Sequence, residues 1–245
     1  MRDFVVFIMS VLTCFFTSLY ASTSLFSVDF SDPNTLQSIP TQIRLGTGQG
    51  AALPENFTGL AIASQEADIQ NQALELSSTS NFRGIGIVID DDLLGAQNFT
   101  LSLDLVDFDV PNTANNINND AFLEISIVGI EDFDTSNSNS VNLSTFTGSA
   151  SAPTGITTFQ EIAFEELTFG EFESANPSID SVDFDFTLNT TPDALVIFIG
   201  ANNAGAFPNP QIIIDNISLS SIPEPHSVSL LCIGSLILLG RRVRK

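Results

Sequence analysis

Along much of the chain, apolar and polar residues alternate one by one, which is the pattern of a β-strand with two unlike faces. Residues 99–105 read Phe-Thr-Leu-Ser-Leu-Asp-Leu, and residues 182–186 read Val-Asp-Phe-Asp-Phe. Residues 122–127 alternate less strictly, with Glu124 and Ser126 as the polar members. No long stretch has the period of about 3.6 residues that a helix needs. The pattern therefore predicts a domain made of strands.

The predicted strands are short and lie between segments rich in Asn, Ser, Gly and Pro, which favour turns. No internal repeat has the spacing of a solenoid or a propeller. These observations indicate an all-β fold, an antiparallel two-sheet sandwich that is jelly-roll-like. The predicted strands cover residues 25–30, 59–63, 73–77, 82–89, 99–106, 121–130, 140–146, 157–169, 181–188, 194–200 and 211–221.

The N-terminal end departs from this alternation. Arg2 precedes an apolar run from Phe4 to Phe16, and small residues surround Ala21. This order is typical of a secretory signal peptide, so we expect residues 1–21 to be removed after Ala21. The alternative is an uncleaved signal anchor.

The C-terminal end has three consecutive parts. Pro223 and Pro225 flank Glu224 and interrupt any strand, because proline has no backbone N–H to donate. An apolar run over residues 228–240 follows, somewhat short against the roughly 20 residues that span a bilayer. The chain then ends in a basic cluster, as transmembrane segments do at their cytoplasmic side. This basic stop consists of Arg241, Arg242, Arg244 and Lys245.

The Pro223-Glu224-Pro225 motif, the apolar run and the arginine cluster together resemble the PEP-CTERM sorting signal of exported bacterial proteins. The resemblance implies a short C-terminal transmembrane helix and an exosortase-type membrane enzyme as partner, which would cut near the motif. The chain then divides into a signal peptide (1–21), an acidic ectodomain (22–221) and a sorting tail (222–245). A buried C-terminal strand and a permanent anchor are the alternatives for the tail.

The charge of the ectodomain limits its partners. The whole chain has a net charge of −22, and most of its basic residues lie in the two ends. Residues 22–221 keep all the acidic residues except Asp3 and Glu224, and only Arg44 and Arg83 among the basic ones, so their net charge is about −25. Such a domain repels nucleic acid and anionic lipid, so we expect no nucleic-acid partner and membrane contact through the tail alone.

The ectodomain also lacks most reactive side chains. Residues 22–221 contain no His, Cys, Lys, Trp or Tyr; the only His is His226, and the cysteines are Cys14 and Cys232. This excludes a Ser-His-Asp or Cys-His catalytic site, a zinc site with His or Cys ligands, and a disulfide within the domain. Carboxylates, hydroxyls, amides and two arginines remain for any chemistry.

A second resemblance concerns the two ends of the ectodomain. Val28-Asp29-Phe30 and the segment 212–217, which contains Asp215, resemble the first and last strands of galactose-binding-like jelly rolls. That resemblance implies that the two strands run side by side and that Asp29 and Asp215 help to hold a structural calcium ion, a cation that prefers oxygen ligands. Alternatively, both are ordinary outward-facing strand residues, and the chain holds no cofactor.

These observations predict an exported, non-catalytic protein of the cell surface or extracellular matrix, with a structural or adhesive role. A glycan-binding module, with exopolysaccharide as partner, is the first alternative. Against this alternative, the ectodomain lacks the Trp and Tyr on which sugars usually stack, and most of its Phe positions fall on the predicted core face. A carboxylate-dependent hydrolase is the second alternative, but no acid pair is marked by the sequence.

Overall fold

The computed structural model describes residues 22–37, 57–63, 67–77, 83–90, 98–109, 121–131, 159–168, 171, 180–203 and 211–222. These residues form strands and one short 3-10 helix, η1 (Thr35–Gln37). The strands are β1 (Thr23–Val28), β2 (Thr58–Ala63), β3 (Ala67–Gln70), β4 (Ala73–Ser77), β5 (Arg83–Ile89), β6 (Asn98–Asp109), β7 (Ala121–Ile130), β8 (Phe159–Thr168), β9 (Ser181–Thr187), β10 (Ala194–Asn203) and β11 (Gln211–Ile222).

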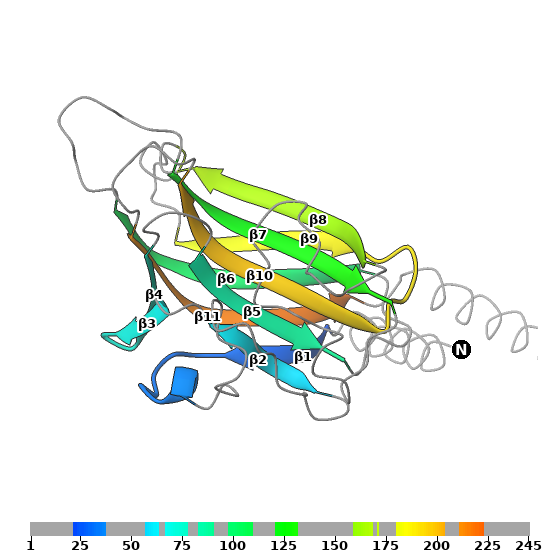
Figure 1. The fold of residues 1–245 in the computed structure, drawn as a ribbon, viewed down its shortest axis with the longest axis horizontal. Helices are drawn as coiled ribbons and strands as arrows, with labels where there is room; N and C mark the ends of the chain where they lie inside the picture. Colours follow the sequence, from blue (N-terminus) through cyan, green and yellow to red (C-terminus); the bar gives the residue numbers. More distant parts are fainter. Residues whose placement is uncertain are drawn as a thin grey trace, which may run out of the picture.

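The strands make two antiparallel sheets that lie as two layers (Figure 1). In the first sheet, called sheet A here, the order is β3-β4-β11-β6-β9, and β1 also pairs with β11. In sheet B the order is β2-β5-β10-β7-β8. Successive strands mostly change sheet, so neighbours in a sheet are distant in sequence, as in a jelly roll. The prediction of an all-β, two-sheet antiparallel sandwich is therefore confirmed.

Most strand positions were predicted well. The bounds of β4 and β7 agree at both ends with the expected segments 73–77 and 121–130. Strand β3 was missed; it forms a hairpin with β4 in which Gln70 pairs with Ala73. The two residues of its turn, Asn71 and Gln72, have positive φ angles of 53° and 66°, as a type I′ turn requires.

Three predictions lie outside the described residues: the strand 140–146, the signal peptide 1–21 and the tail from residue 223 onward. They stay predictions. Among the residues that the structure describes, no helix has the length and apolar character to cross a membrane.

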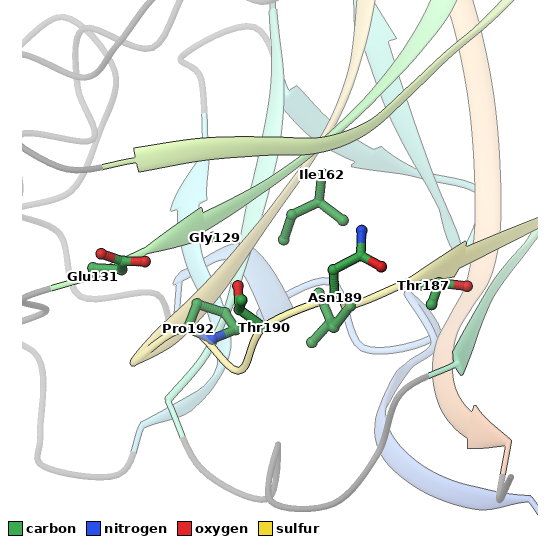
Figure 2. A pocket seen from close by; sticks show the side chains of 8 residues that line it. Gly129, Glu131, Ile162, Thr187, Asn189, Thr190 and Pro192 are labelled. Atoms are coloured by element: carbon green, nitrogen blue, oxygen red, sulfur yellow. The ribbon is translucent and has the colours of Figure 1, made fainter.

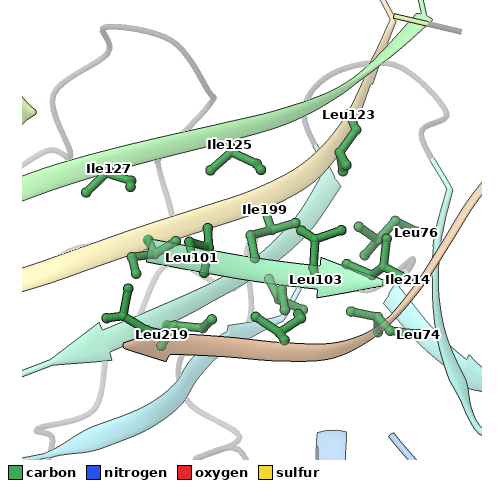
Figure 3. Close-up of a cluster of buried hydrophobic side chains, with 14 of the residues drawn as sticks. Leu74, Leu76, Leu101, Leu103, Leu123, Ile125, Ile127, Ile199, Ile214 and Leu219 are labelled. Carbon is green, nitrogen blue, oxygen red and sulfur yellow. The ribbon is translucent and has the colours of Figure 1, made fainter. Parts of the chain in front are cut away.

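The core lies between the two sheets. Alternate residues of β6 and β11 meet those of β5, β7 and β10, and leucine and isoleucine dominate the contact (Figure 3). Phe99 of β6 stacks on Phe186 of β9 with ring centroids 5.1 Å apart. Each such ring or aliphatic side chain contributes roughly 1.5–3 kcal/mol to the free energy of unfolding when it is fully buried. The phenylalanines of these strands therefore serve the core, as the alternation indicated.

The outer face of sheet B differs from the expectation. The alternation placed Glu124 and Ser126 on the polar side of β7, which is usually the solvent side. Both are on the side opposite the core residue Ile125, as predicted, but both are completely buried. The central strands β5, β7 and β10 are thus buried on both faces, and Val88, Val196 and Phe198 share this second buried face. The alternation therefore predicted correctly which side of β7 Glu124 and Ser126 face, but it predicted wrongly that this side is exposed to solvent.

Candidate functional site

The two predicted calcium ligands lie at the junction of the first and last strands. β1 runs antiparallel beside β11, with Val28 paired to Ile217, as the resemblance implied. Asp29 follows β1 directly, and the backbone N–H of the next residue, Phe30, donates to Asp215 Oδ1 at 3.2 Å. Phe30 itself is fully buried, so this bond holds the end of β1 against β11.

The Asp29 carboxylate is exposed and bound to its own turn. Its Oδ1 accepts from the Ser31 backbone N–H at 3.1 Å and from the Ser31 hydroxyl at 2.5 Å. These two hydrogen bonds, the hydroxyl first, lower the pKa of Asp29 below its ordinary value of 3.8 because they stabilise the charged form. Asp29 is therefore ionised at neutral pH, as a cation ligand must be.

A bulge in β11 adds polar groups near Asp215. The register of β11 against β6 shifts between Asp215 and Ser218, and Asn216 has a positive φ of 49°. Asn216 Nδ2 donates to Asp104 Oδ2 of β6 at 2.7 Å. Among the described residues, however, no three His, Cys, Asp or Glu side chains are grouped so as to hold a metal ion. Calcium binding by Asp29 and Asp215 stays a prediction.

The exposed face of sheet A carries a regular set of polar side chains, which we call the serine–aspartate face. In one row across the sheet, Ser27 of β1 pairs with Ser218 of β11, Ser218 with Ser102 of β6, and Ser102 with Asp183 of β9. The next row likewise has three hydroxyl side chains and one aspartate. It contains Ser24, Ser220, Thr100 and Asp185.

In β6, β9 and β11 the side chains share one face because their neighbours point into the core. Leu101 and Leu219, for example, are buried, so the residues on either side of each face outward. In β1, Ser24 and Ser27 are three residues apart and reach the same face because the register against β11 shifts between Ser24 and Phe26. The acidic triplet 183–185 follows the same rule: Asp183 and Asp185 are exposed, and Phe184 packs against the core. The two unlike faces that the alternation of residues 182–186 predicted are therefore confirmed, with phenylalanine inside and carboxylates outside.

Hydrogen bonds order the acidic side of the face. The Ser102 hydroxyl donates to Asp183 Oδ1, and the Thr100 hydroxyl donates to Asp185 Oδ1, both at 2.6 Å. At the next position, the Thr187 hydroxyl donates to Asn98 Oδ1 at 2.8 Å. Each carboxylate keeps free lone pairs for further donors, since an ionised carboxylate accepts about four hydrogen bonds.

A small cavity lies at another place, between β7, β8 and the segment joining β9 to β10 (Figure 2). Gly129, Ile162, Asn189 and Pro192 are among its lining residues. Its volume is about 40 Å³, far less than the roughly 300 Å³ or more of a typical ligand pocket. It accommodates water rather than a sugar ring or a cofactor.

The sequence did not reveal the buried polar residues of β7. Glu124 and Ser126 face outward from sheet B and are fully buried, and no group in the described part of the chain hydrogen-bonds the Ser126 hydroxyl. A buried polar group without a partner is uncommon and costs free energy. A signal was present in the neighbouring strands, since the continuous apolar runs of β5 and β10 are typical of strands buried on both faces.

Comparison with known proteins identifies no family. No protein-family model matches the chain, and no curated protein matches it. The PEP-CTERM resemblance therefore stays a prediction.

Several solved structures are distantly similar, and they are carbohydrate-binding modules. The CBM22-1 xylan-binding domain of Paenibacillus barcinonensis has 12% identity, a TM-score of 0.38, and coverage of 84% of this chain and 98% of its own. The CBM22-1 and GH10 modules of a Clostridium thermocellum xylanase have 9% identity and a TM-score of 0.37, over 82% of this chain and 29% of theirs.

A mannan-recognising carbohydrate-binding module has 12% identity and a TM-score of 0.31, over 82% of this chain and 98% of its own. These likenesses assign neither fold nor ligand to this chain. The fold is given by the chain's own strand order.

Proposed function

We propose that this chain is a non-catalytic module that binds polysaccharide at the cell surface or in the extracellular matrix, through the serine–aspartate face. The observation that carries the proposal is the arrangement of eight hydroxyl and carboxylate side chains in two aligned rows on one exposed face. The structural or adhesive role expected from the sequence becomes, in this proposal, adhesion to a glycan.

The chemistry of the face suits a polyhydroxylated chain. Sugar hydroxyls both donate and accept, and the face offers serine hydroxyls toward β1 and carboxylates toward β9. Thr100 and Ser102 fix the carboxylates in place, so little side-chain entropy is lost on binding. No aromatic ring lies among the eight residues, and each exposed hydrogen bond contributes only about 0.5–1.5 kcal/mol. We therefore expect weak binding, with a Kd on the order of millimolar for a single module.

The same geometry argues against hydrolysis. Glycosidases place two carboxyl groups on either side of one glycosidic bond, in a cleft that encloses the sugar. Asp183 and Asp185 are both exposed on a sheet surface, and each accepts from a neighbouring hydroxyl. They are placed to contact a glycan and not to cleave it.

Delivery to the surface belongs to the same proposal. Residues 1–21 would direct export, and residues 222–245 would hold the chain in the inner membrane until an exosortase-type enzyme cuts near Pro223-Glu224-Pro225. Mass spectrometry of protein released by the native host tests this step. Released protein that still contains Lys245 would contradict it.

Glycan binding is tested by pull-down and affinity electrophoresis against a panel of soluble polysaccharides. The double variant Ser102→Ala/Ser218→Ala removes two hydroxyls from the centre of one row and should weaken binding about tenfold. Glu165→Gln, which changes an exposed residue of β8 in sheet B, is the matched control and should bind like the unaltered protein. Failure to retain any polysaccharide, or equal binding by the double variant, would refute the proposal.

A further inference from the structure

We infer that the serine–aspartate face selects uncharged polysaccharides and rejects acidic ones, with Asp183 and Asp185 as the residues that discriminate. The inference rests on the proposed function, since it concerns the ligand class of the same face. It follows from where the two carboxylates lie and from the absence of any positive side chain in the four strands that form the face.

The two carboxylates lie at the same end of the two rows. Asp183 ends the row that begins at Ser27, and Asp185 ends the row that begins at Ser24. Adjacent strands are about 4.8 Å apart, so each row extends roughly 14 Å across four strands. A glycan lying along a row would meet serine hydroxyls first and a carboxylate last.

The four described strands that form the face supply no cation to compensate these charges. Strands β1, β6, β9 and β11 contain neither Lys nor Arg. The hydroxyls of Thr100 and Ser102 orient Asp183 and Asp185 but leave their negative charge in place. A neutral sugar can donate its hydroxyls to both carboxylates, whereas a uronic acid or a carboxymethyl group would bring a like charge beside them.

The expected discrimination is large enough to measure. Two unit charges about 4 Å apart in water repel by roughly 1 kcal/mol, which is about a fivefold change in affinity for each carboxylate. With two carboxylates in reach, an acidic chain should bind at least tenfold more weakly than a neutral one at low salt. The difference should shrink as salt is added, because the charges are exposed and become screened.

The experiment uses neutral polymers and their carboxymethyl derivatives, which keep the same backbone. The pairs are dextran with carboxymethyl dextran, and hydroxyethyl cellulose with carboxymethyl cellulose, in low-salt buffer with EDTA. The double variant Asp183→Asn/Asp185→Asn removes both charges and keeps an acceptor oxygen at each position. It should weaken binding of the neutral polymer, because an amide oxygen is a weaker acceptor than a carboxylate. The ratio of neutral to acidic affinity, which is the quantity compared between variants, should fall toward one.

A second double variant separates the local effect from the overall charge. Glu165→Gln/Glu166→Gln removes two exposed charges from β8 in sheet B, so the net charge changes equally. It should keep the full discrimination. If both double variants reduce the discrimination equally, or if neither does, the assignment to Asp183 and Asp185 is wrong while glycan binding stands. If neither the unaltered protein nor any variant retains a polymer of either pair, the inference and the proposed function both fail.

Discussion

Replacing Ser126 by alanine should stabilise the protein, although it removes a polar group from a strand. Ser126 lies on β7, is completely buried, and its hydroxyl has no hydrogen-bond partner among the residues that the structure describes. Folding therefore removes this hydroxyl from water without replacing the lost hydrogen bonds. The change to alanine removes the one atom responsible and leaves the backbone and the Cβ in place.

The magnitude follows from two opposing terms. An unsatisfied buried polar group costs about 1–3 kcal/mol. The void left by one oxygen forfeits a few contacts worth about 0.1–0.2 kcal/mol each. We therefore expect Ser126→Ala to raise the free energy of unfolding by about 1 kcal/mol. In a domain of this size that corresponds to an increase in Tm of about 2–4 °C.

Ser102→Ala is the matched control, because it makes the same chemical change in a strand of sheet A. The Ser102 hydroxyl donates to Asp183 Oδ1 at 2.6 Å, so its loss should lower the free energy of unfolding by about 0.5–1 kcal/mol. The two variants should thus shift stability in opposite directions.

Urea unfolding followed by far-UV circular dichroism measures both effects. Fluorescence is unsuited because the chain has no Trp and only one Tyr. The slope of free energy against urea should be unchanged in both variants, so that midpoint shifts report stability alone. If Ser126→Ala lowers the free energy of unfolding by more than about 0.5 kcal/mol, its hydroxyl has a stabilising partner and the reasoning is wrong.

Three further predictions concern the turn of the β3–β4 hairpin and the β1–β11 junction. Gln72→Gly should raise the free energy of unfolding by about 0.5 kcal/mol, because glycine adopts the positive φ of a type I′ turn without strain; an unchanged or lower urea midpoint would contradict this. Ser31→Ala should raise the pKa of Asp29 toward 3.8, measured by NMR titration of the carboxyl carbon. Because the folded pKa of Asp29 is lowered, its contribution to stability is present above about pH 4 and is lost as the pH falls through the folded pKa. The free energy of unfolding of Ser31→Ala should therefore differ from that of the unaltered protein above about pH 4, and the two should agree below the folded pKa. If Asp29 and Asp215 hold calcium, millimolar EDTA should lower the Tm, and an unchanged Tm would exclude a structural calcium ion.

Much of the architecture could be predicted from local pattern alone. Strict alternation predicted the strands β6 and β9, and a long apolar run predicted β10. Strand β3 was missed because four residues are too few to establish a period, and because its turn uses Asn71-Gln72 rather than a glycine pair. Local sequence gives the position of a strand more reliably than its partner.

The candidate site required the fold. Ser27, Thr100, Asp183 and Ser220 lie far apart in the sequence, and only the pairing register of four strands brings them onto one face. Register depends on contacts between strands and cannot be obtained from the alternation within one. Likewise, alternation put Glu124 opposite the core, but it contains no information on whether that side is covered.

The pairing of β11 has a mechanical consequence for a protein held at a surface. β11 pairs with β6 along one edge, and with β4 and then β1 along the other. If the protein is tethered beyond Ile222, a pulling force enters through a strand that is bonded on both edges. Several backbone hydrogen bonds then bear the force at the same time. The module therefore resists unfolding by force better than it would if its tether continued from an outermost strand.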